Sequence, residues 1–488
     1  MYDFAGADAV CRALGVEVRG GRAAGKRARA MDEAGQHQAP GRDAPAAPAA
    51  AGGPPPTTAS TPATPPYHET PAHPREARPL DFRGKRYLAP LTTVGNLPFR
   101  ALAVSLGAEV TCGEMALATQ LLAGRPGEWA LTKRHPSEAC FGVQIAAGYG
   151  DAGARVAAAV VAHCPGGPPD FLDINAGCPI DLVCDKQAGA ALLRKPARLE
   201  SVVRAVVGCA AGVPVTLKVR KGYDDGKDSV HEWIPTRAVS WGLAAVTIHG
   251  RSREQRYTRA ADWGYVGRVA EEVWMGREGG GGGSGGDQPP PPPRPSPLLQ
   301  VIGGGDVYTF HDHERHLAAY PHLATTMVAR GGLIKPWLFT EMAERREWDI
   351  SAPERLDLVS RFCSLGLAHW GSDGRGVETT RRFLLEWLSY AHRYVPLGLL
   401  SERLPPELTG AERMGLRCPP LAGRSELETV LASPDPGDWV RISELVLGPA
   451  PASLRFVPKH KSKSLYVVPG KRDGSEGGGG GEDDEENG

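Results

Sequence analysis

The chain has 488 residues, of which 62 are glycine, 44 are proline and 41% are hydrophobic. Glycine and proline together fill about a fifth of the positions, more than folded domains usually hold, so we expect part of the chain to be disordered. Lysine plus arginine and aspartate plus glutamate both number 56. The formal charge is therefore zero, and net charge gives no reason to expect a nucleic-acid or membrane partner.

The nine cysteines form no CxxC pair and no zinc-like spacing, which favours a reducing, intracellular compartment and predicts no metal site. The first twenty residues hold no apolar signal region, and the longest apolar run, residues 156–162, is too short to cross a bilayer. We expect a cytoplasmic or nuclear protein without a membrane partner, and targeting of the N-terminal leader to an organelle stays open. Nothing in the sequence indicates a stable protein partner.

Three segments have compositions that cannot bury enough apolar surface to fold. Residues 1–78 are dominated by alanine, proline, glycine and threonine, and residues 279–297 hold seven glycines and seven prolines. Residues 467–488 form an acidic tail. We predict a disordered leader, a disordered insert and a disordered tail.

Between these segments, eight short apolar runs alternate with helix-length stretches such as residues 152–163 and 199–209. The runs are RYLAPL near residue 86, EVTCGEM near 109, CFGVQI near 140, FLDINAG near 171, VPVTLKV near 213, AAVTIHG near 244, LLQVIGG near 298 and ATTMVAR near 324. This alternation is typical of parallel strands covered by helices. Eight units within residues 79–346 favour an α/β fold of the (β/α)8 TIM-barrel type, with 279–297 as an insert before the seventh strand.

The strand pattern stops after about residue 350. Ser351 and Glu354 have capping-box spacing, which predicts a helix that runs to Trp370. Residues 379–395 place their apolar side chains on one helical face, with Arg381 and Arg382 elsewhere. We therefore predict a smaller all-helical domain over residues 347–466.

In a TIM barrel, reactive residues belong at the C-terminal ends of strands. Cys178 follows a predicted strand between a glycine and a proline, where a thiol can face a pocket, or it is a small buried hydrophobe. Lys218 stands where an apolar strand residue is expected, and it either meets a negative partner or reaches to water. His249 is either a ligand contact or a core histidine.

Two glycine runs end the seventh and eighth predicted strands, Gly303 to Gly305 and Gly331 to Gly332. Glycines there let backbone amides approach an anion, and these loops commonly hold phosphate in barrels. The loop after the sixth strand interleaves basic and aromatic residues, which suits an RNA backbone with an unstacked base or is simply a solvated charged loop. Its relevant members are Arg251, Arg253, Arg256 and Tyr257.

Several motifs together resemble the tRNA-dihydrouridine synthases, most closely the eukaryotic type 3 group that modifies tRNA position 47. The motifs are APLTTVGNLPFR, TCGEMA, NAGCPIDLV, HGRSREQRYT, ARGGLIKPWLFTE, HWGSD, TRRFLLEWLS and PKHKSKSLY. The similarity runs from about residue 81 to 466 with only the insert breaking it. It implies a barrel that binds FMN, a helical tRNA-binding domain, and NADPH or NADH as reductant, with mRNA as a possible further substrate.

The resemblance also implies roles for individual residues. Cys178 would donate a proton to C5 of uridine after hydride from FMN reaches C6. The residues that would contact FMN are Pro90, Leu91, Thr92, Gln144, Asn175, Lys218, His249, Gly304, Gly305, Arg330 and Gly331. Those that would contact RNA are Arg251, Arg253, Arg256, Tyr257, Arg381 and Arg382.

The sequence departs from the family pattern at Gly304, where the family usually has asparagine, and it lacks the CCCH zinc fingers that often precede the barrel in this group. Two other functions remain as alternatives to a tRNA-uridine reductase. One is an FMN barrel that reduces a free pyrimidine. The other is an RNA-binding protein with a decayed active site, which Gly304 and the insert suggest.

Overall fold

The structure is a computed structural model. It describes residues 3–19, 80–276, 299–399, 414 and 422–459. The predicted insert 279–297, the tail 467–488 and residues 20–78 of the predicted leader lie outside the described residues. Of the helices in these ranges, none combines the length and apolar character needed to cross a bilayer.

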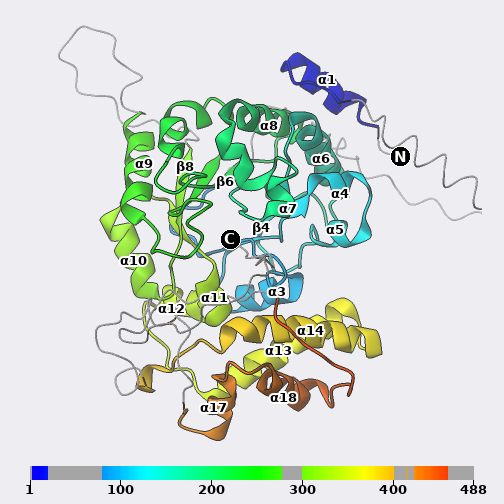
Figure 1. The fold of residues 1–488 in the computed structure, drawn as a ribbon, viewed down its shortest axis with the longest axis vertical. Helices are drawn as coiled ribbons and strands as arrows, with labels where there is room; N and C mark the ends of the chain where they lie inside the picture. Colours follow the sequence, from blue (N-terminus) through cyan, green and yellow to red (C-terminus); the bar gives the residue numbers. More distant parts are fainter. Residues whose placement is uncertain (1–2, 20–79, 277–298, 400–413, 415–421, 460–488) are drawn as a thin grey trace, which may run out of the picture.

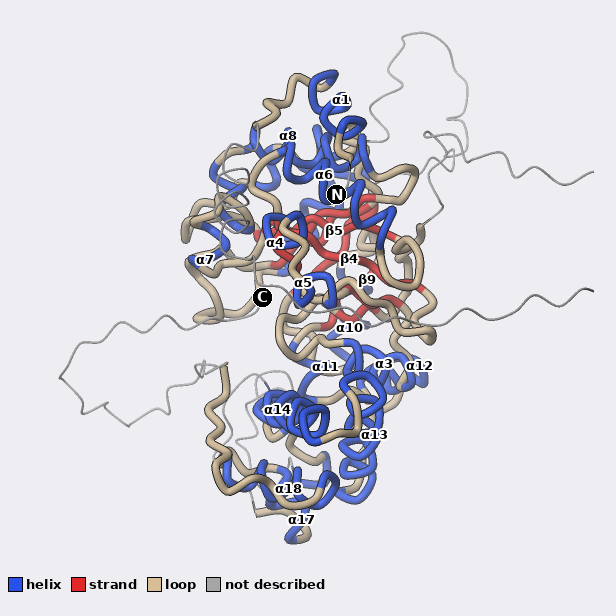
Figure 2. The backbone as a smooth tube through the Cα atoms, turned by 90° about the vertical axis from the view of Figure 1, so that its right-hand side faces the viewer, coloured by secondary structure: helices blue, strands red, loops and turns tan. Residues whose placement is uncertain are grey.

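Eight parallel strands close into a barrel, which confirms the predicted fold class (Figures 1 and 2). The sheet order in the described part is β2-β1-β9-β8-β7-β6-β5-β4-β3, and a further pairing between β2 and β4 closes the ring. The eight are β1 (Tyr87–Leu88), β2 (Val110–Cys112), β4 (Cys140–Ala146), β5 (Phe171–Ala176), β6 (Val215–Arg220), β7 (Ala245–His249), β8 (Gln300–Gly304) and β9 (Thr325–Val328). The two-residue strand β3 (Ala116–Leu117) was not predicted, because so short an extension of β4 has no periodicity of its own.

Helices surround the strands on the outside. They are α3 (Leu97–Ser105), α4 (Ala118–Leu122), α5 (Pro126–Ala130), α6 (Gly150–His163), α7 (Asp181–Cys184), α8 (Pro196–Cys209), α9 (Trp263–Met275), α10 (Phe310–Ala319), α11 (Arg330–Ile334) and α12 (Leu338–Glu344). The helices α6 and α8 confirm the two that were predicted from Ala/Val/Leu spacing. Their buried faces cover the barrel core.

The two ends of the barrel differ in character. At the base, where strands begin, Phe82 stacks on Tyr87 with ring centroids 5.4 Å apart, and both meet the edge of Phe171. A Cβ added to Gly142 would lie 2.2 Å from the Phe171 ring, so only glycine leaves room for this aromatic plug. Residues 277–298 connect α9 to β8, and this connection also joins the chain at the base. The polar strand ends gather at the opposite end, the mouth.

A helical region follows the barrel, with α13 (Ala352–Trp370), α14 (Gly374–Ala391), α17 (Glu426–Leu431) and α18 (Pro436–Leu447) (Figure 2). The predicted capping box is present, since the Ser351 hydroxyl and Glu354 exchange hydrogen bonds with each other's backbone. The indole N–H of Trp387 donates to the Leu333 carbonyl at 2.9 Å, and the Trp387 ring meets the edge of Phe99. The helical region therefore shares one core with the barrel.

The prediction of a leader that is disordered from its first residue is wrong for residues 3–19. They include helix α1 (Ala5–Ala13), which packs against α6 and α8. Ala7 and Cys11 are buried there against Ala154 and Ala205. The alanine-rich composition that suggested disorder also supplies the small side chains that let two helices approach closely.

An ion pair is completely buried between α3 and the start of β4. The Arg100 guanidinium contacts the Glu138 carboxylate at 2.7 Å, and their side chains are 2% and 0% exposed. The remaining guanidinium donors reach the carbonyls of Gly95 and Lys133, while the Thr111 hydroxyl donates to Glu138. Every polar group of the pair is therefore engaged.

A second buried carboxyl lies two residues beyond β2. The Glu114 carboxylate accepts the backbone N–H of Thr93 at 2.6 Å. Thr93 has a φ of 69°, a left-handed conformation that is costly for a β-branched residue. Glu114 thus holds the strained turn that follows β1.

Replacement of Glu138 by alanine is expected to destabilise the fold by about 3–5 kcal/mol, because it leaves the Arg100 charge buried and unpaired. Urea titration followed by circular dichroism measures this change. The matched control is Glu200→Ala, which removes the exposed Arg204–Glu200 pair and should cost less than about 0.5 kcal/mol. Equal losses in the two variants would contradict the prediction.

Glu114 is expected to make stability fall as pH rises. Burial raises the pKa of its carboxyl from 4.5 to about 7, against the opposing effects of the Thr93 amide and Arg100. A folded-state pKa above the unfolded one means that the contribution is complete below about pH 4.5 and is lost as pH rises through about 7. The unfolding free energy of the wild type should drop by about 3 kcal/mol more than that of Glu114→Gln between about pH 4.5 and pH 8. Parallel drops would show that Glu114 does not titrate in this range.

Candidate active site

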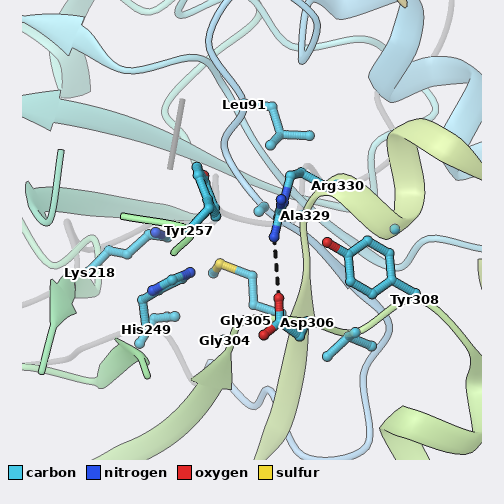
Figure 3. A pocket seen from close by; sticks show the side chains of 15 residues that line it. Leu91, Lys218, His249, Tyr257, Gly304, Gly305, Asp306, Tyr308, Ala329 and Arg330 are labelled. Carbon is cyan, nitrogen blue, oxygen red and sulfur yellow. Dashed lines mark hydrogen bonds and ion pairs between the residues drawn. The ribbon is translucent and has the colours of Figure 1, made fainter. Parts of the chain in front are cut away.

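A cavity opens at the mouth of the barrel (Figure 3). It lies between the loop after β1 and the ends of β6, β7, β8 and β9. Eight of the residues predicted from sequence line it: Leu91, Lys218, His249, Tyr257, Gly304, Gly305, Arg330 and Gly331. Pro90 and Thr92 flank Leu91 in the same loop but do not line the cavity.

One wall of the cavity carries Arg330 and Asp306, and the Asp306 carboxylate also pairs with Arg251, which does not line the cavity itself. The Asp306 carboxylate accepts hydrogen bonds from the Arg251 guanidinium at 2.6 Å and from the Arg330 guanidinium at 3.2 Å. The Arg330 guanidinium also lies 4.0 Å from the centre of the Tyr257 ring (Figure 3). Burial would raise the pKa of Asp306, but Arg251 and Arg330 outweigh it and lower the pKa. Arg251 is fully buried, and its Nη1 has no hydrogen-bond partner. The wall therefore keeps an uncompensated positive charge that suits an anion.

The glycines beside this wall differ in what they require. Gly305 has a φ of 117°, and an added Cβ would lie 2.6 Å from the Ala261 Cβ. A Cβ on Gly304 would make only ordinary contacts, the nearest at 3.6 Å to the Ile248 carbonyl. Glycine is thus obligatory at 305, whereas position 304 has room for the asparagine that the family usually has there.

Lys218 and His249 face the cavity from β6 and β7 (Figure 3). Burial lowers the pKa of the Lys218 ammonium to about 8, with nearby Arg220 acting in the same direction. Burial, again with Arg220, also holds the pKa of His249 well below its ordinary value, so the imidazole is neutral. Its Nδ1 is buried without a partner. Both side chains therefore offer polar atoms to a ligand, and the solvent-facing alternative for Lys218 is wrong.

A hydrogen-bond chain crosses the barrel beneath the cavity. The Asp173 carboxylate accepts the Gln144 amide at 2.7 Å, and the Gln144 oxygen accepts the Asn175 amide at 2.9 Å. The Asn175 oxygen in turn accepts the backbone N–H groups of Gly177 and Cys178. Gln144 and Asn175 do not line the cavity, so in this structure they position the turn that bears Cys178.

Cys178 lies beside the cavity but does not line it. It is 5% exposed and packs with Ala146, Val183 and Ala188. Burial raises the pKa of its thiol to about 11, although the Ile180 amide and Arg220 act the other way. The thiol is therefore protonated at neutral pH, which is the state that a proton donor needs.

Arg220 is a functional candidate that the sequence analysis missed. It ends β6 two residues after Lys218, and alternate residues of a strand share a face, so the Lys-Val-Arg spacing contained the signal. Its Nε donates to the Gly177 carbonyl at 2.9 Å and its Nη1 to Ser252 at 3.0 Å. Its Nη2 is buried without a partner. The two N–H donors of this Nη2 thus remain for a ligand at the mouth.

The residues predicted to bind RNA are scattered. Arg251 is buried against Asp306, and Arg253 contacts the Asp181 carboxylate and the Pro179 carbonyl. The prediction for Arg381 is wrong: it is 1% exposed and donates to the Ser443 hydroxyl and the Gly448 carbonyl, so it ties α14 to α18. Arg381 lies off the apolar face of the helix because it makes buried hydrogen bonds to a neighbouring helix, not because it faces solvent.

Four of the RNA predictions keep some solvent access. Arg253, Arg256 and Tyr257 are half-buried in the loop after β7, and Arg382 is exposed on α14. Within the described ranges, no three His, Cys, Asp or Glu side chains gather as a metal ion would require.

Comparison with known proteins adds to this geometry. Residues 87–275 match the sequence model of the dihydrouridine synthase family. The chain is 49% identical to the tRNA-dihydrouridine(47) synthase [NAD(P)(+)]-like protein of Arabidopsis thaliana over 80% of this chain and 52% of that protein. The corresponding values are 46%, 81% and 55% for the Coprinopsis cinerea enzyme and 46%, 80% and 54% for the human protein. The chain thus spans about half the length of these curated relatives, and its similarity to the dihydrouridine synthase family is carried by residues 87–275 of the barrel.

Proposed function

We propose that this chain reduces uridine to 5,6-dihydrouridine in tRNA, at variable-loop position 47, with FMN as the bound flavin and NADPH or NADH as the reductant. The observation that carries the proposal is that one barrel mouth holds both a positively charged cavity and, two residues after the end of β5, the buried and protonated thiol of Cys178. The names of the relatives, which specify tRNA, position 47 and NAD(P), support the substrate and the reductant.

The residues at the mouth fit FMN. A phosphate suits the wall with Arg251 and Arg330, because two guanidinium groups face only one carboxylate and the Arg251 Nη1 has no partner. Gly305, where a side chain would clash, lets a ligand approach the backbone. Leu91 and Met327 supply apolar surface for a ring system, and Lys218 and His249 supply its polar contacts.

The thiol of Cys178 provides the proton for C5 of the uracil ring. When bound, FMN supplies the hydride that adds to C6. The thiol can give up its proton at neutral pH because the carbanion that it meets is far more basic than a thiolate. The nearby Arg220 stabilises the resulting thiolate, since its charge lowers the pKa of the Cys178 thiol.

Addition at C6 drives negative charge toward the uracil carbonyl O4, and the chain has buried cations to offset it. The Nη2 group of Arg220 has no partner and Arg220 contacts the Gly177 carbonyl next to Cys178, while Lys218 lies two residues earlier on the same strand face. Both act in a dry environment, where a charge has a larger effect than in water.

The partner in this proposal is an RNA with an extruded base. A uridine must leave its stack to reach the cavity. Arg256, Tyr257 and Arg382 keep the solvent access that contacts to such a nucleotide require. A free pyrimidine needs none of these residues, and this distinguishes the proposal from the free-pyrimidine alternative.

Replacement of Cys178 by alanine is expected to lower dihydrouridine formation at least about a hundredfold, because general acid catalysis typically contributes this much. FMN binding should persist, since Cys178 does not line the cavity. Mass spectrometry of tRNA nucleosides after incubation with FMN and NADPH measures the product. Cys140→Ala, at the start of β4 and so at the opposite end of the barrel, is the matched control and should retain activity.

Two further arms of the same assay separate the alternatives. Free uridine and orotate should accept no electrons at rates comparable with tRNA. An enzyme that reduces free uridine as fast as tRNA would be the free-pyrimidine reductase. A wild-type protein that binds no FMN and forms no dihydrouridine would be an RNA-binding protein with a decayed site, and the proposal would fail.

Alanine at positions 304 and 305 is expected to have different effects on flavin binding. Gly304→Ala adds a Cβ with ordinary contacts and should leave FMN affinity nearly unchanged. Gly305→Ala forces a positive φ and a clash with Ala261, at a cost of about 1–3 kcal/mol. Quenching of flavin fluorescence on titration measures both affinities. The prediction is wrong if the two variants bind FMN equally well.

A further inference from the structure

The N-terminal helix α1 packs on the outside of the barrel against α6 and α8 (Figure 1), and we call the surface of these two helices that it covers the groove. Cys11 is fully buried in a small cluster with Ala7, Ala154 and Ala205. Residues 20–79 separate this segment from the first strand in sequence. The segment therefore binds the barrel surface much as a separate peptide would, because about sixty residues separate it from the first strand.

The groove is shaped for this particular segment. A Cβ on Gly208 would lie 2.8 Å from Val10, and one on Gly150 would lie 2.7 Å from Val16. Two glycines on two different helices thus open the space into which these valines fit. Any larger residue at either position would meet the docked segment.

Charged contacts fix the direction of the docked segment. Arg155 of α6 makes a bidentate contact with the Asp8 carboxylate, at 2.7 and 3.0 Å. At the other end, the backbone N–H of Arg19 donates to Asp151 at 3.1 Å. The Asp8 and Arg155 side chains are only about a fifth exposed, so their pairing is stronger than that of a fully solvated pair.

The end of the docked segment connects to the loop that bears Cys178. The Arg19 guanidinium lies 3.7 Å from the centre of the Tyr149 ring, and Arg198 lies 4.9 Å from the same ring. Arg198 donates to the Gln187 side chain at 2.8 Å. Gln187 has a φ of 59°, a strained position in the stretch from Cys178 to Gly189. Arg19, Tyr149 and Arg198 therefore brace this loop from outside.

A helix of nine residues is too short to be stable alone in water, so α1 forms only where the groove binds it. We propose that the groove between α6 and α8 is a docking surface for a short amphipathic helix, that residues 3–19 are its resident ligand, and that their docking buttresses the loop carrying Cys178. The importance of that loop for activity rests on the proposed function. The docking itself does not.

Hydrogen exchange of the full chain, followed by mass spectrometry, tests the proposal without flavin or tRNA. Cys11→Asp places a carboxylate in the buried cluster, near Asp8 and Asp151, and should release the segment. Exchange should then rise at least about tenfold in residues 5–19, and also rise in residues 178–189. Ala9→Asp makes the same change on the exposed face of α1 and should leave both segments protected.

A synthetic peptide of residues 3–19 supplies the second arm. Added to the Cys11→Asp chain, it should restore protection in residues 178–189, whereas a peptide with Arg19→Ala should bind without restoring it. Unchanged protection of residues 5–19 in Cys11→Asp would overturn the docking. Release of α1 without any change in the hydrogen exchange of residues 178–189 would show that the docked segment does not support the loop that carries Cys178. Neither result depends on whether the chain makes dihydrouridine.

Discussion

The mouth of the barrel depends on one buried carboxylate, Asp173. It lies in the middle of β5 and offers only acceptors to the Thr216 hydroxyl and the Gln144 amide. Because Gln144 must donate to it, the Gln144 oxygen faces Asn175, and the Asn175 oxygen is left to accept the amides of the Cys178 turn. A single acceptor thus orients two side-chain amides and a backbone turn in sequence, and it does so where water cannot compete.

The buried charges around the mouth are only partly compensated by partners within the protein. Lys218, Arg220, Arg251 and Arg330 are all buried or nearly buried there, and Asp306 is the carboxylate that pairs with two of them. Each cation is desolvated at a cost that its partners in the protein only partly offset, and two of the arginines keep a nitrogen without any partner. Such an arrangement suits an anionic or carbonyl-bearing ligand. Burial, together with these surrounding cations, holds the pKa of His249 low and keeps its imidazole neutral.

Much of the fold could be predicted, because parallel strands that are buried on both sides have continuous apolar sequences. Lys218 and His249 were visible as polar residues that interrupt or end such runs, and Gly305 as part of a glycine turn. Arg220 was missed because a second cation two residues after Lys218 resembles a solvated strand end. Asp173 was missed because a hydrogen-bonded core carboxylate leaves no periodic signal. Arg381 and α1 were mistaken because burial by a distant segment cannot be read from local composition.

The aromatic plug closes the base of the barrel, while the candidate site lies at the mouth, so changes of sequence at the two ends have different consequences. The strand β8 begins at Gln300 on the plugged side, whereas Gly304 at its other end touches the cavity. A change of length ahead of β8 therefore joins the barrel at the end opposite the cavity, and the cost of closing a longer loop grows only slowly. For the experimenter, the same position is a natural site for splicing in a reporter domain or an affinity handle without disturbing the mouth.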